Sequence, residues 1–327
     1  MIRVRTGSRL HFGLFSLPSE AAAAWLNQEG KPTVPRRQFG GVGLMIDKPG
    51  IELTIERADR FSAEGPLAER ASQFAHSYCN SVGINDAFHL RVESAAPEHA
   101  GLGTGTQLGL AVARAIAELT DRRPRDAVNL ARQVGRGVRS ALGVHGFDSG
   151  GFLVEGGKLN ERSISPLLAR HDFPADWHIL LITPRDLVGT HSRRELDAFA
   201  AIAKQPQDDR TTEALCRLVL LAILPALTER DLKTFGKAVY DFNRRVGEMF
   251  RSAQGGLYAH PRIEAIIKLV RLTGIHCVGQ SSWGPTVFAI ASQEKLLDLC
   301  NGLRVMGVAE DQLLLTTACN HGAVVSA

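Results

Sequence analysis

The chain has 327 residues, of which 44% are hydrophobic and 22% charged, a balance that is typical of a soluble globular protein and excludes a largely disordered chain. Its net charge of +4 comes from 38 basic and 34 acidic residues, spread along the sequence without the basic tract typical of nucleic-acid or membrane-surface binding. We therefore expect neither nucleic acid nor a membrane as a partner. The length predicts two domains, because it exceeds the usual size of one compact core.

The five cysteines are widely spaced and include no CxxC pair. Reduced thiols in a cytosolic protein are the simplest interpretation. The N-terminal segment lacks the long apolar core of a signal peptide, and we find no uninterrupted apolar stretch that would span a bilayer. These features predict a cytoplasmic protein.

In chain order, the first half begins with strands and continues with mixed elements. Apolar runs predict strands over residues 2–6, 10–15, 42–46 and 51–56. The elements that follow are helix 66–82, strand 88–93, a glycine loop, an amphipathic helix to residue 119, helix 124–136 and tight turns around a strand at 152–155. A boundary near residues 166–174 predicts domains of residues 1–168 and 169–327.

The second half alternates strands and helices. The predicted order is strand 178–183, helices within 193–250, helix 261–273, strands 275–279 and 286–291, helix 294–303 and strand 313–317. Without the additional helices this is the βαββαβ order of a ferredoxin-like domain. The whole chain is therefore expected to be α+β.

Basic residues gather near the start of the chain, within its first 37 residues: Arg3, Arg5, Arg9, His11, Arg36 and Arg37. Such a cluster suits a small polyanion, because guanidinium groups form charge-assisted hydrogen bonds with phosphate. A solvated surface face is the alternative interpretation. Arg36 and Arg37 end a connection over residues 16–41, and long loops inside domains are commonly functional.

The segment PEHAGLGTGTQ (97–107) places Gly101, Gly103 and Gly105 where a predicted strand leads into a helix. Glycines there let backbone N–H groups approach an anion, and the helix start adds a favourable dipole. Thr104 and Thr106 can offer hydroxyls to a phosphate or to bound magnesium. Since turns also need glycine, a purely structural loop is the alternative.

The pattern Pro, three residues, Gly-Leu-Gly-Thr, followed by an amphipathic helix, resembles the phosphate-binding motif of the GHMP kinase superfamily. This resemblance implies an N-terminal domain of βαβ type and a ferredoxin-like C-terminal domain. Those kinases usually continue with a second serine that lies near magnesium, whereas this chain has Gly105. The departure argues against phosphoryl transfer from ATP.

Four further segments, taken with the glycine loop, resemble one branch of the superfamily, the β-ribofuranosylaminobenzene 5′-phosphate synthases. They are SRLHFGLF (8–15), RRQFGGVGLMI (36–46), GVHGFDSGGFLVEGG (143–157) and GQSSWGPTVFAI (279–290). The resemblance implies decarboxylating transfer from phosphoribosyl diphosphate to 4-aminobenzoate or 4-hydroxybenzoate, in methanopterin biosynthesis. It also implies magnesium as cofactor and a homodimer.

The resemblance also suggests a role for each candidate site residue. Gly101, Gly103, Thr104, Gly105 and Thr106 would hold diphosphate or its magnesium. The other candidates are Arg9 and His11 for a substrate anion or as general acid, Arg36 and Arg37 to close over the site, Asp148 as a catalytic or magnesium-binding carboxylate, and Gln280, Ser281, Ser282 and Trp283 opposite the phosphate loop. Residues 189–192 can also join the site.

Several of these roles have structural alternatives. Asp148 can simply cap a turn, since it precedes Ser-Gly-Gly. His11 can be a hydrogen-bonded core residue, and Arg9 an ordinary surface pair. Trp283 can stack on an aromatic acid or plug the space between domains.

The implied chemistry requires little acid–base catalysis. Positive charge develops on the ribose as diphosphate leaves, so clamping of anions and an aromatic pocket are the main tasks. An ATP-dependent small-molecule kinase and a non-catalytic ligand sensor are the competing hypotheses, since a fold does not fix a function.

Overall fold

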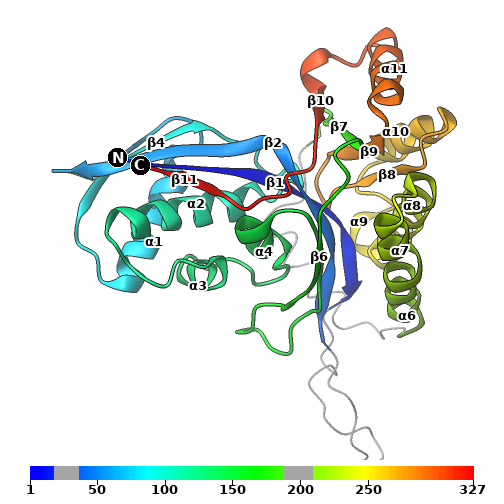
Figure 1. Ribbon diagram of the computed structural model, residues 1–327. Coiled ribbons are helices and arrows are strands. Elements are labelled where there is room, and N and C mark those ends of the chain that lie inside the picture. Colours follow the sequence, from blue (N-terminus) through cyan, green and yellow to red (C-terminus); the bar gives the residue numbers. More distant parts are fainter. Residues whose placement is uncertain (18–36, 188–208) are drawn as a thin grey trace, which may run out of the picture.

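The computed structural model describes residues 1–17, 37–187 and 209–327. Two long strands, β1 (Ile2–Ser16) and β2 (Phe39–Ala58), pair in antiparallel fashion in its larger sheet. Each merges two of the predicted strands, because the register shifts between Thr6 and Ser8, and between His11 and Gly13, bend β1 without interrupting it. In Figure 1 these strands run from the region of the N-terminus toward the second sheet.

The larger sheet has the order β11-β1-β2-β4-β3, with β5 paired to β2 and to β6. Its other strands are β3 (Ser62–Glu64), β4 (Ala87–Ser94), β5 (Phe152–Glu155), β6 (Leu167–His171) and β11 (Val324–Ser326). Four helices pack beside it (Figure 1): α1 (Ala68–Val82), α2 (Thr104–Leu119), α3 (Ala127–Gln133) and α4 (Leu142–Ser149). The apolar face of α2 is completely buried against this sheet and α1, which holds its N-terminus in a fixed place.

One helix differs from the sequence expectation. The glycine-rich residues 143–149, predicted as tight turns, form the helix α4. Its glycines serve close packing rather than turns: a Cβ at Gly143 would lie 3.3 Å from the side chain of Gln107, and one at Gly146 would overlap the side chain of Met45. Glycine thus lets α4 approach α2 and β2 closely.

The smaller sheet is antiparallel with the order β10-β7-β9-β8. Its strands are β7 (His178–Ile182), β8 (Cys277–Gln280), β9 (Val287–Ala291) and β10 (Leu313–Thr316). Numbered by their order in the chain, the four strands lie side by side in the order 4-1-3-2. The helices α10 (Pro261–Leu272) and α11 (Gln293–Val305) pack against this sheet, as a ferredoxin-like unit requires. The α+β prediction is confirmed.

Further helices lie on the other side of the smaller sheet (Figure 1). They are α6 (Asp209–Leu218), a π-helical turn (Val219–Ile223), α7 (Leu224–Thr228), α8 (Leu232–Met249) and α9 (Arg251–Gln254). The run Arg210–Thr228 is long and apolar enough to cross a membrane by length and composition. This is weak evidence for a membrane span, because core helices of soluble proteins can be equally long and apolar. Leu215, Val219 and Ile223 of this run are buried in the apolar core.

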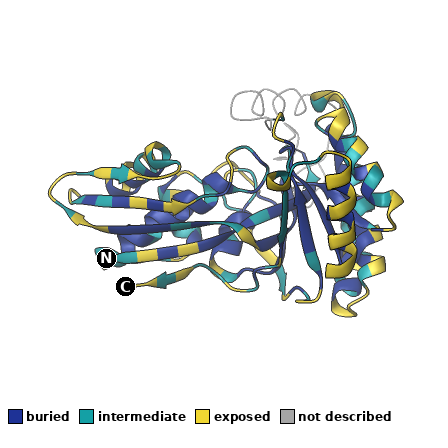
Figure 2. Cartoon of the chain, turned by 90° about the horizontal axis from the view of Figure 1, so that it is seen from above, coloured by how far each residue is buried: buried dark blue, intermediate teal, exposed yellow. Residues whose placement is uncertain are grey.

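One apolar cluster joins the two sheets. Phe12 of β1 lies against Phe288 of β9, with ring centroids 4.9 Å apart, and Phe152 of β5 lies 6.0 Å from Phe235 of α8. Figure 2 shows this interior as buried, while the outer faces of the helices beside the smaller sheet are exposed. Each fully buried aromatic side chain contributes about 1.5–3 kcal/mol of transfer free energy, so the junction between the sheets is firmly packed.

The strand pairing crosses the expected domain division. The boundary between residues 168 and 169 falls inside β6, which pairs with β5 in the larger sheet. Ala318 bridges to Ile46, and β11 pairs with β1. Residues 318–326 therefore lie with the first sheet, although they follow the ferredoxin-like unit in sequence.

Candidate functional site: an arginine-rich cavity between the sheets

The glycine loop leads from β4 into α2, as the sequence predicts. Gly101 and Gly103 have φ angles of +83° and +73°, a conformation that favours glycine. Gly103 is the N-cap of α2 and offers no side chain to cap the first turn. The amides and the positive dipole end of this 16-residue helix are thus turned toward the space beside β1.

Hydrogen bonds hold this loop between β1 and the C-terminal half. The N–H of Arg9 donates to the carbonyl of Leu102 at 2.9 Å. Ser281 Oγ donates to the carbonyl of Gly101 at 2.7 Å and accepts from the N–H of His11 at 3.1 Å. Ser281 is completely buried and does not line the cavity described below, so it joins the loop to β1.

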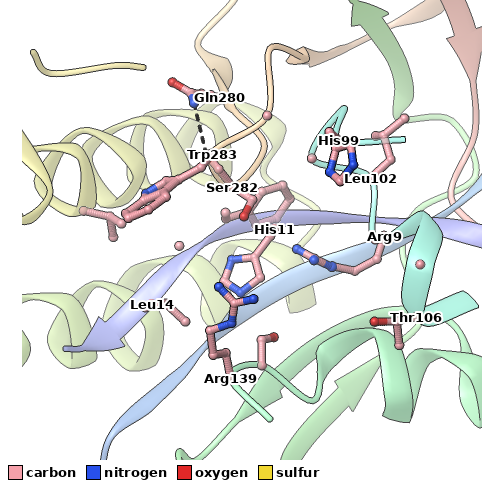
Figure 3. A pocket seen from close by; sticks show the side chains of 18 of the residues that line it. Arg9, His11, Leu14, His99, Leu102, Thr106, Arg139, Gln280, Ser282 and Trp283 are labelled. Atoms are coloured by element: carbon pink, nitrogen blue, oxygen red, sulfur yellow. Dashed lines mark hydrogen bonds between the residues drawn. The ribbon is translucent and has the colours of Figure 1, made fainter. Parts of the chain in front are cut away.

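A cavity of about 330 Å³ opens at this junction. It lies between the start of α2, the middle of β1, the segment 135–140, the region of α8 and α9, and the loop 280–284. Figure 3 shows Arg9 and His11, both from β1, between Thr106 and Trp283. Most sequence-predicted site residues line it: Arg9, His11, Gly101, Gly103, Thr104, Gly105, Thr106, Gln280, Ser282 and Trp283.

One end of the cavity is strongly cationic. Arg9, Arg70 and Arg136 lie there beside the glycine loop. Arg139 lines the cavity as well, and none of the lining residues in the described part of the chain is Asp or Glu. Glu98, an exposed neighbour, forms an ion pair with Arg70. Four guanidinium groups in one cavity form a site suited to a polyanion.

Three of these arginines were missed by sequence reasoning. Arg70 comes from α1, while Arg136 and Arg139 come from the segment after α3. The guanidinium carbons of Arg70 and Arg136 lie 5.8 and 5.9 Å from the ring centroid of Phe74. The only sequence signal is the basic, glycine-spaced run GRGVR at 135–139.

The other end of the cavity is apolar. Leu14, Val246, Phe250, Leu257 and Trp283 line it. The rings of Phe250 and Trp283 meet edge to face, with centroids 4.9 Å apart and an interplanar angle of 89°. Such an aromatic corner can hold a flat ring of similar size.

The loop 280–284 is held by Asn243 of α8, a residue not anticipated from the sequence. Its Nδ2 donates to the carbonyls of Phe12 and Gln280 at 2.8 and 2.9 Å, and its Oδ1 accepts from the N–H of Gln280 at 3.0 Å. Gln280 Nε2 donates to the carbonyl of Ser282 at 3.1 Å, the dashed line in Figure 3. One buried amide therefore fixes this loop relative to β1.

His11 is buried, with 4% of its surface exposed. Burial, and then the charge of Arg9, lower the pKa of His11 well below its ordinary value. The imidazole is consequently neutral at neutral pH. It can exchange one hydrogen bond with a substrate but does not add positive charge.

The remaining predicted residues lie elsewhere. Asp148 does not line the cavity: its Oδ2 accepts from the N–H of Ala127 at 2.8 Å, at the first residue of α3. The carboxylate thus contacts the start of α3, and not the turn at residues 149–151 that the capping alternative named. Arg37 is exposed and donates to the carbonyl of Gly157 at 2.9 Å. Arg36 and residues 189–192 lie outside the described residues.

The residues named for magnesium do not converge on one site. Thr104 Oγ1 donates to the carbonyl of Pro97 at 2.8 Å, Thr106 Oγ1 accepts from Arg136 at 3.4 Å, and Asp148 Oδ2 accepts from the N–H of Ala127. Over residues 1–17, 37–187 and 209–327, no group of three or more His, Cys, Asp or Glu is placed to hold a metal ion. Magnesium sites in proteins usually include one or two carboxylates, and none of the described residues that line this cavity is Asp or Glu, so its lining does not fit a magnesium ion held by protein carboxylates.

Comparison with known proteins identifies the class to which this fold and cavity belong. Residues 67–156 match the family model "GHMP kinases N terminal domain", and residues 223–304 match "GHMP kinases C terminal". The homoserine kinase from Cytophaga hutchinsonii superposes with a TM-score of 0.68 at 17% identity, covering 99% of this chain and 97% of that one. The mevalonate diphosphate decarboxylase from Staphylococcus aureus gives 0.66 at 15% identity, covering 100% and 99%. These structures establish the GHMP kinase fold.

Curated relatives define the family more closely. Three archaeal proteins named beta-ribofuranosylphenol 5′-phosphate synthase are similar over most of their length. The Archaeoglobus fulgidus protein is 34% identical, with 89% of this chain and 88% of that protein covered. The Methanothermobacter thermautotrophicus protein is 31% identical, with 98% and 97% covered.

The chain belongs to this synthase family and is therefore a pentosyl-transferring enzyme, as the resemblance of its sequence segments predicts. This membership argues against the non-catalytic sensor.

Proposed function

We propose that the protein transfers the phosphoribosyl group of phosphoribosyl diphosphate to 4-hydroxybenzoate or 4-aminobenzoate, releasing carbon dioxide and diphosphate, in methanopterin biosynthesis. The observation that supports this most is the division of one cavity into an arginine-lined end and an aromatic end. A phosphorylated donor with a diphosphate leaving group matches the first end, and a flat benzoate matches the second.

In this proposal the two substrates would occupy different parts of the same cavity. Diphosphate would lie at the start of α2 beside Arg70 and Arg136, and the benzoate ring beside Phe250 and Trp283. The carbon–oxygen bond of the donor breaks, and its electron pair leaves with diphosphate. The ring carbon bearing the carboxylate bonds to C1 of the ribose, and loss of carbon dioxide restores the aromatic ring.

This reaction suits the groups that the cavity offers. Guanidinium groups and loop amides stabilise the negative charge of departing diphosphate. Arg9, which lies against the glycine loop, and neutral His11 both line the cavity and can orient the donor without forming a strong base. The apolar walls limit water, which would otherwise capture the cationic ribose.

The relatives' name bears on the choice of acceptor. It specifies a ribofuranosylphenol phosphate, which is the product that 4-hydroxybenzoate would give. We therefore propose 4-hydroxybenzoate as the preferred acceptor, with 4-aminobenzoate as the alternative.

The test is a product assay on the purified, full-length protein. Phosphoribosyl diphosphate would be mixed with each benzoate, labelled at its carboxyl group, with and without magnesium. Carbon dioxide, diphosphate and the riboside are expected in equal amounts. A folded protein that releases neither carbon dioxide nor diphosphate would overturn the proposal.

The kinase hypothesis has less support from the site. Residue 105 carries no hydroxyl, and Arg70 occupies the space where a side chain would begin. ATP consumption across a panel of alcohols and sugars, with this chain alone, would decide between the two enzymes. The proposal also includes a cytoplasmic homodimer, which light scattering of the purified protein would test for assembly.

A further inference from the structure

Gly105 and two arginines are packed together at the cationic end of the cavity. A Cβ built on Gly105 would overlap the Nη2 atom of Arg70, would lie 2.9 Å from its guanidinium carbon and would lie 3.2 Å from Nη2 of Arg136. Gly105 is within α2 and has no positive φ. A side chain at this position would have to displace the two guanidinium groups that cover it, whereas the backbone conformation does not itself require glycine.

The two arginines are brought together from separate elements. Arg70 projects from α1 and Arg136 from the segment after α3, and both guanidinium groups lie near the ring of Phe74. Arg136 also donates to Thr106 Oγ1 at 3.4 Å. Both guanidinium groups therefore reach the same point beside Gly105, and one diphosphate group there could accept charge-assisted hydrogen bonds from both.

We infer that Arg70 and Arg136 form a guanidinium clamp that binds the diphosphate group directly and neutralises its charge without a metal ion held by the protein, with Gly105 as the residue that makes room for the clamp. The inference rests on the proposed function for the identity of the anion. It explains why a hydroxyl residue at position 105 is replaced by glycine while the lining residues described include no carboxylate.

The carboxylate of Glu98 would compete with a bound anion for Arg70. Glu98 pairs with Arg70, and both side chains are about a third exposed (33% and 29%). An incoming diphosphate must therefore displace the Glu98 carboxylate from Arg70. This contact predicts that removing the charge of Glu98 strengthens anion binding, a direction opposite to the effect of removing either arginine.

The test measures binding of inorganic diphosphate to the full-length protein by calorimetry, in buffer with EDTA and no divalent cation. We expect wild-type protein to bind, and Arg70→Gln and Arg136→Gln each to weaken binding about tenfold or more, as the loss of a charge-assisted hydrogen bond implies. Gly105→Ser should weaken binding because it displaces the clamp. Glu98→Gln should bind a few times more tightly.

Two kinds of control keep the result interpretable. Arg57→Gln removes an exposed arginine that pairs with one carboxylate, Asp86, as Arg70 pairs with Glu98, and it should bind like the wild type. Arg70→Lys and Arg136→Lys keep the charge but lose the planar fork, so they report on the clamp even if a glutamine variant fails to fold. They should bind more weakly than the wild type.

Two results would overturn the inference. One is diphosphate affinity in EDTA that is unchanged in the Arg70 and Arg136 variants. The other is wild-type binding that occurs only after magnesium is added. If the enzyme turns over both substrates but the Arg70 and Arg136 variants bind diphosphate as the wild type does, the clamp alone is refuted. If the variants lose diphosphate affinity as expected but the wild type releases no carbon dioxide, the proposed function alone is refuted.

Discussion

The glycine loop and the loop 280–284 touch at Gly101 and Gly284. A substitution at this contact tests whether the packing of the two loops determines the geometry of the cavity. A Cβ at Gly284 would overlap the backbone nitrogen of Gly101 and the carbonyl group of Ala100, far inside van der Waals contact. Gly284 has no positive φ, so the obstacle is steric alone. Since carbon atoms pack at about 3.5–4.0 Å, Gly284→Ala must push the two loops apart by roughly 1 Å.

This separation should affect both stability and binding. Overpacking of this kind typically costs about 1–3 kcal/mol, which we expect as a loss in the free energy of unfolding measured by urea denaturation. A shift of about 1 Å in a positioning loop can also reduce turnover by about a hundredfold. Phosphoribosyl diphosphate turnover and binding would be measured on the same samples.

A matched control is available in α11. Gly302→Ala makes the same chemical change where no heavy atom lies within 4 Å of the new Cβ. It should leave turnover unchanged and raise the free energy of unfolding by up to about 1 kcal/mol, because alanine favours helix over glycine. If Gly284→Ala behaves like Gly302→Ala, the loops do not set the site as described.

Three further predictions concern the same junction. Because the folded pKa of His11 lies below its unfolded value of about 6.5, its contribution to stability is complete above that pH and is lost on acidification. His11→Gln should therefore reduce the pH dependence of unfolding below pH about 6.5, by up to about 1.4 kcal/mol per pH unit; an identical profile would contradict this. Asn243→Ala should lower the free energy of unfolding by about 1–3 kcal/mol in urea denaturation, and Asn243→Asp, which loses both donors, should not restore it. Gly103→Val should reduce affinity for phosphoribosyl diphosphate in calorimetry, since a β-branched residue is strained at φ +73° and would crowd Arg9; unchanged affinity would refute the role of the loop.

The sequence was most informative where local pattern and chemistry coincide. The glycine loop and the helix that follows it are visible as strand, glycines and a 3.6-residue apolar repeat, and the structure places them so. The ferredoxin-like order is equally readable from short strands and helices. Local signals of this kind depend on residues close together in the chain.

Features built by tertiary contact could not be predicted in the same way. Residues 143–149 form α4 because their glycines fit against Gln107 and Met45, which sequence alone does not place nearby. Arg70 and Arg136 are 66 positions apart and meet only when α1 and the segment after α3 pack beside α2. The catalytic role predicted for Asp148 stays a prediction: the residue does not line the cavity, and its Oδ2 accepts from the N–H of Ala127, a contact that its sequence position does not reveal.

The pairing of β11 with β1 also has a consequence for how the molecule is assembled. Val324 pairs with Arg5 and Ser326 with Arg3 on the strand that carries Arg9 and His11. During synthesis this edge of β1 stays unpaired until more than three hundred further residues have been added, since contacts between residues so distant in sequence form late. A ribosome-bound chain lacking β11 would therefore expose the edge of β1, which makes this strand a point where a nascent chain is open to wrong pairing.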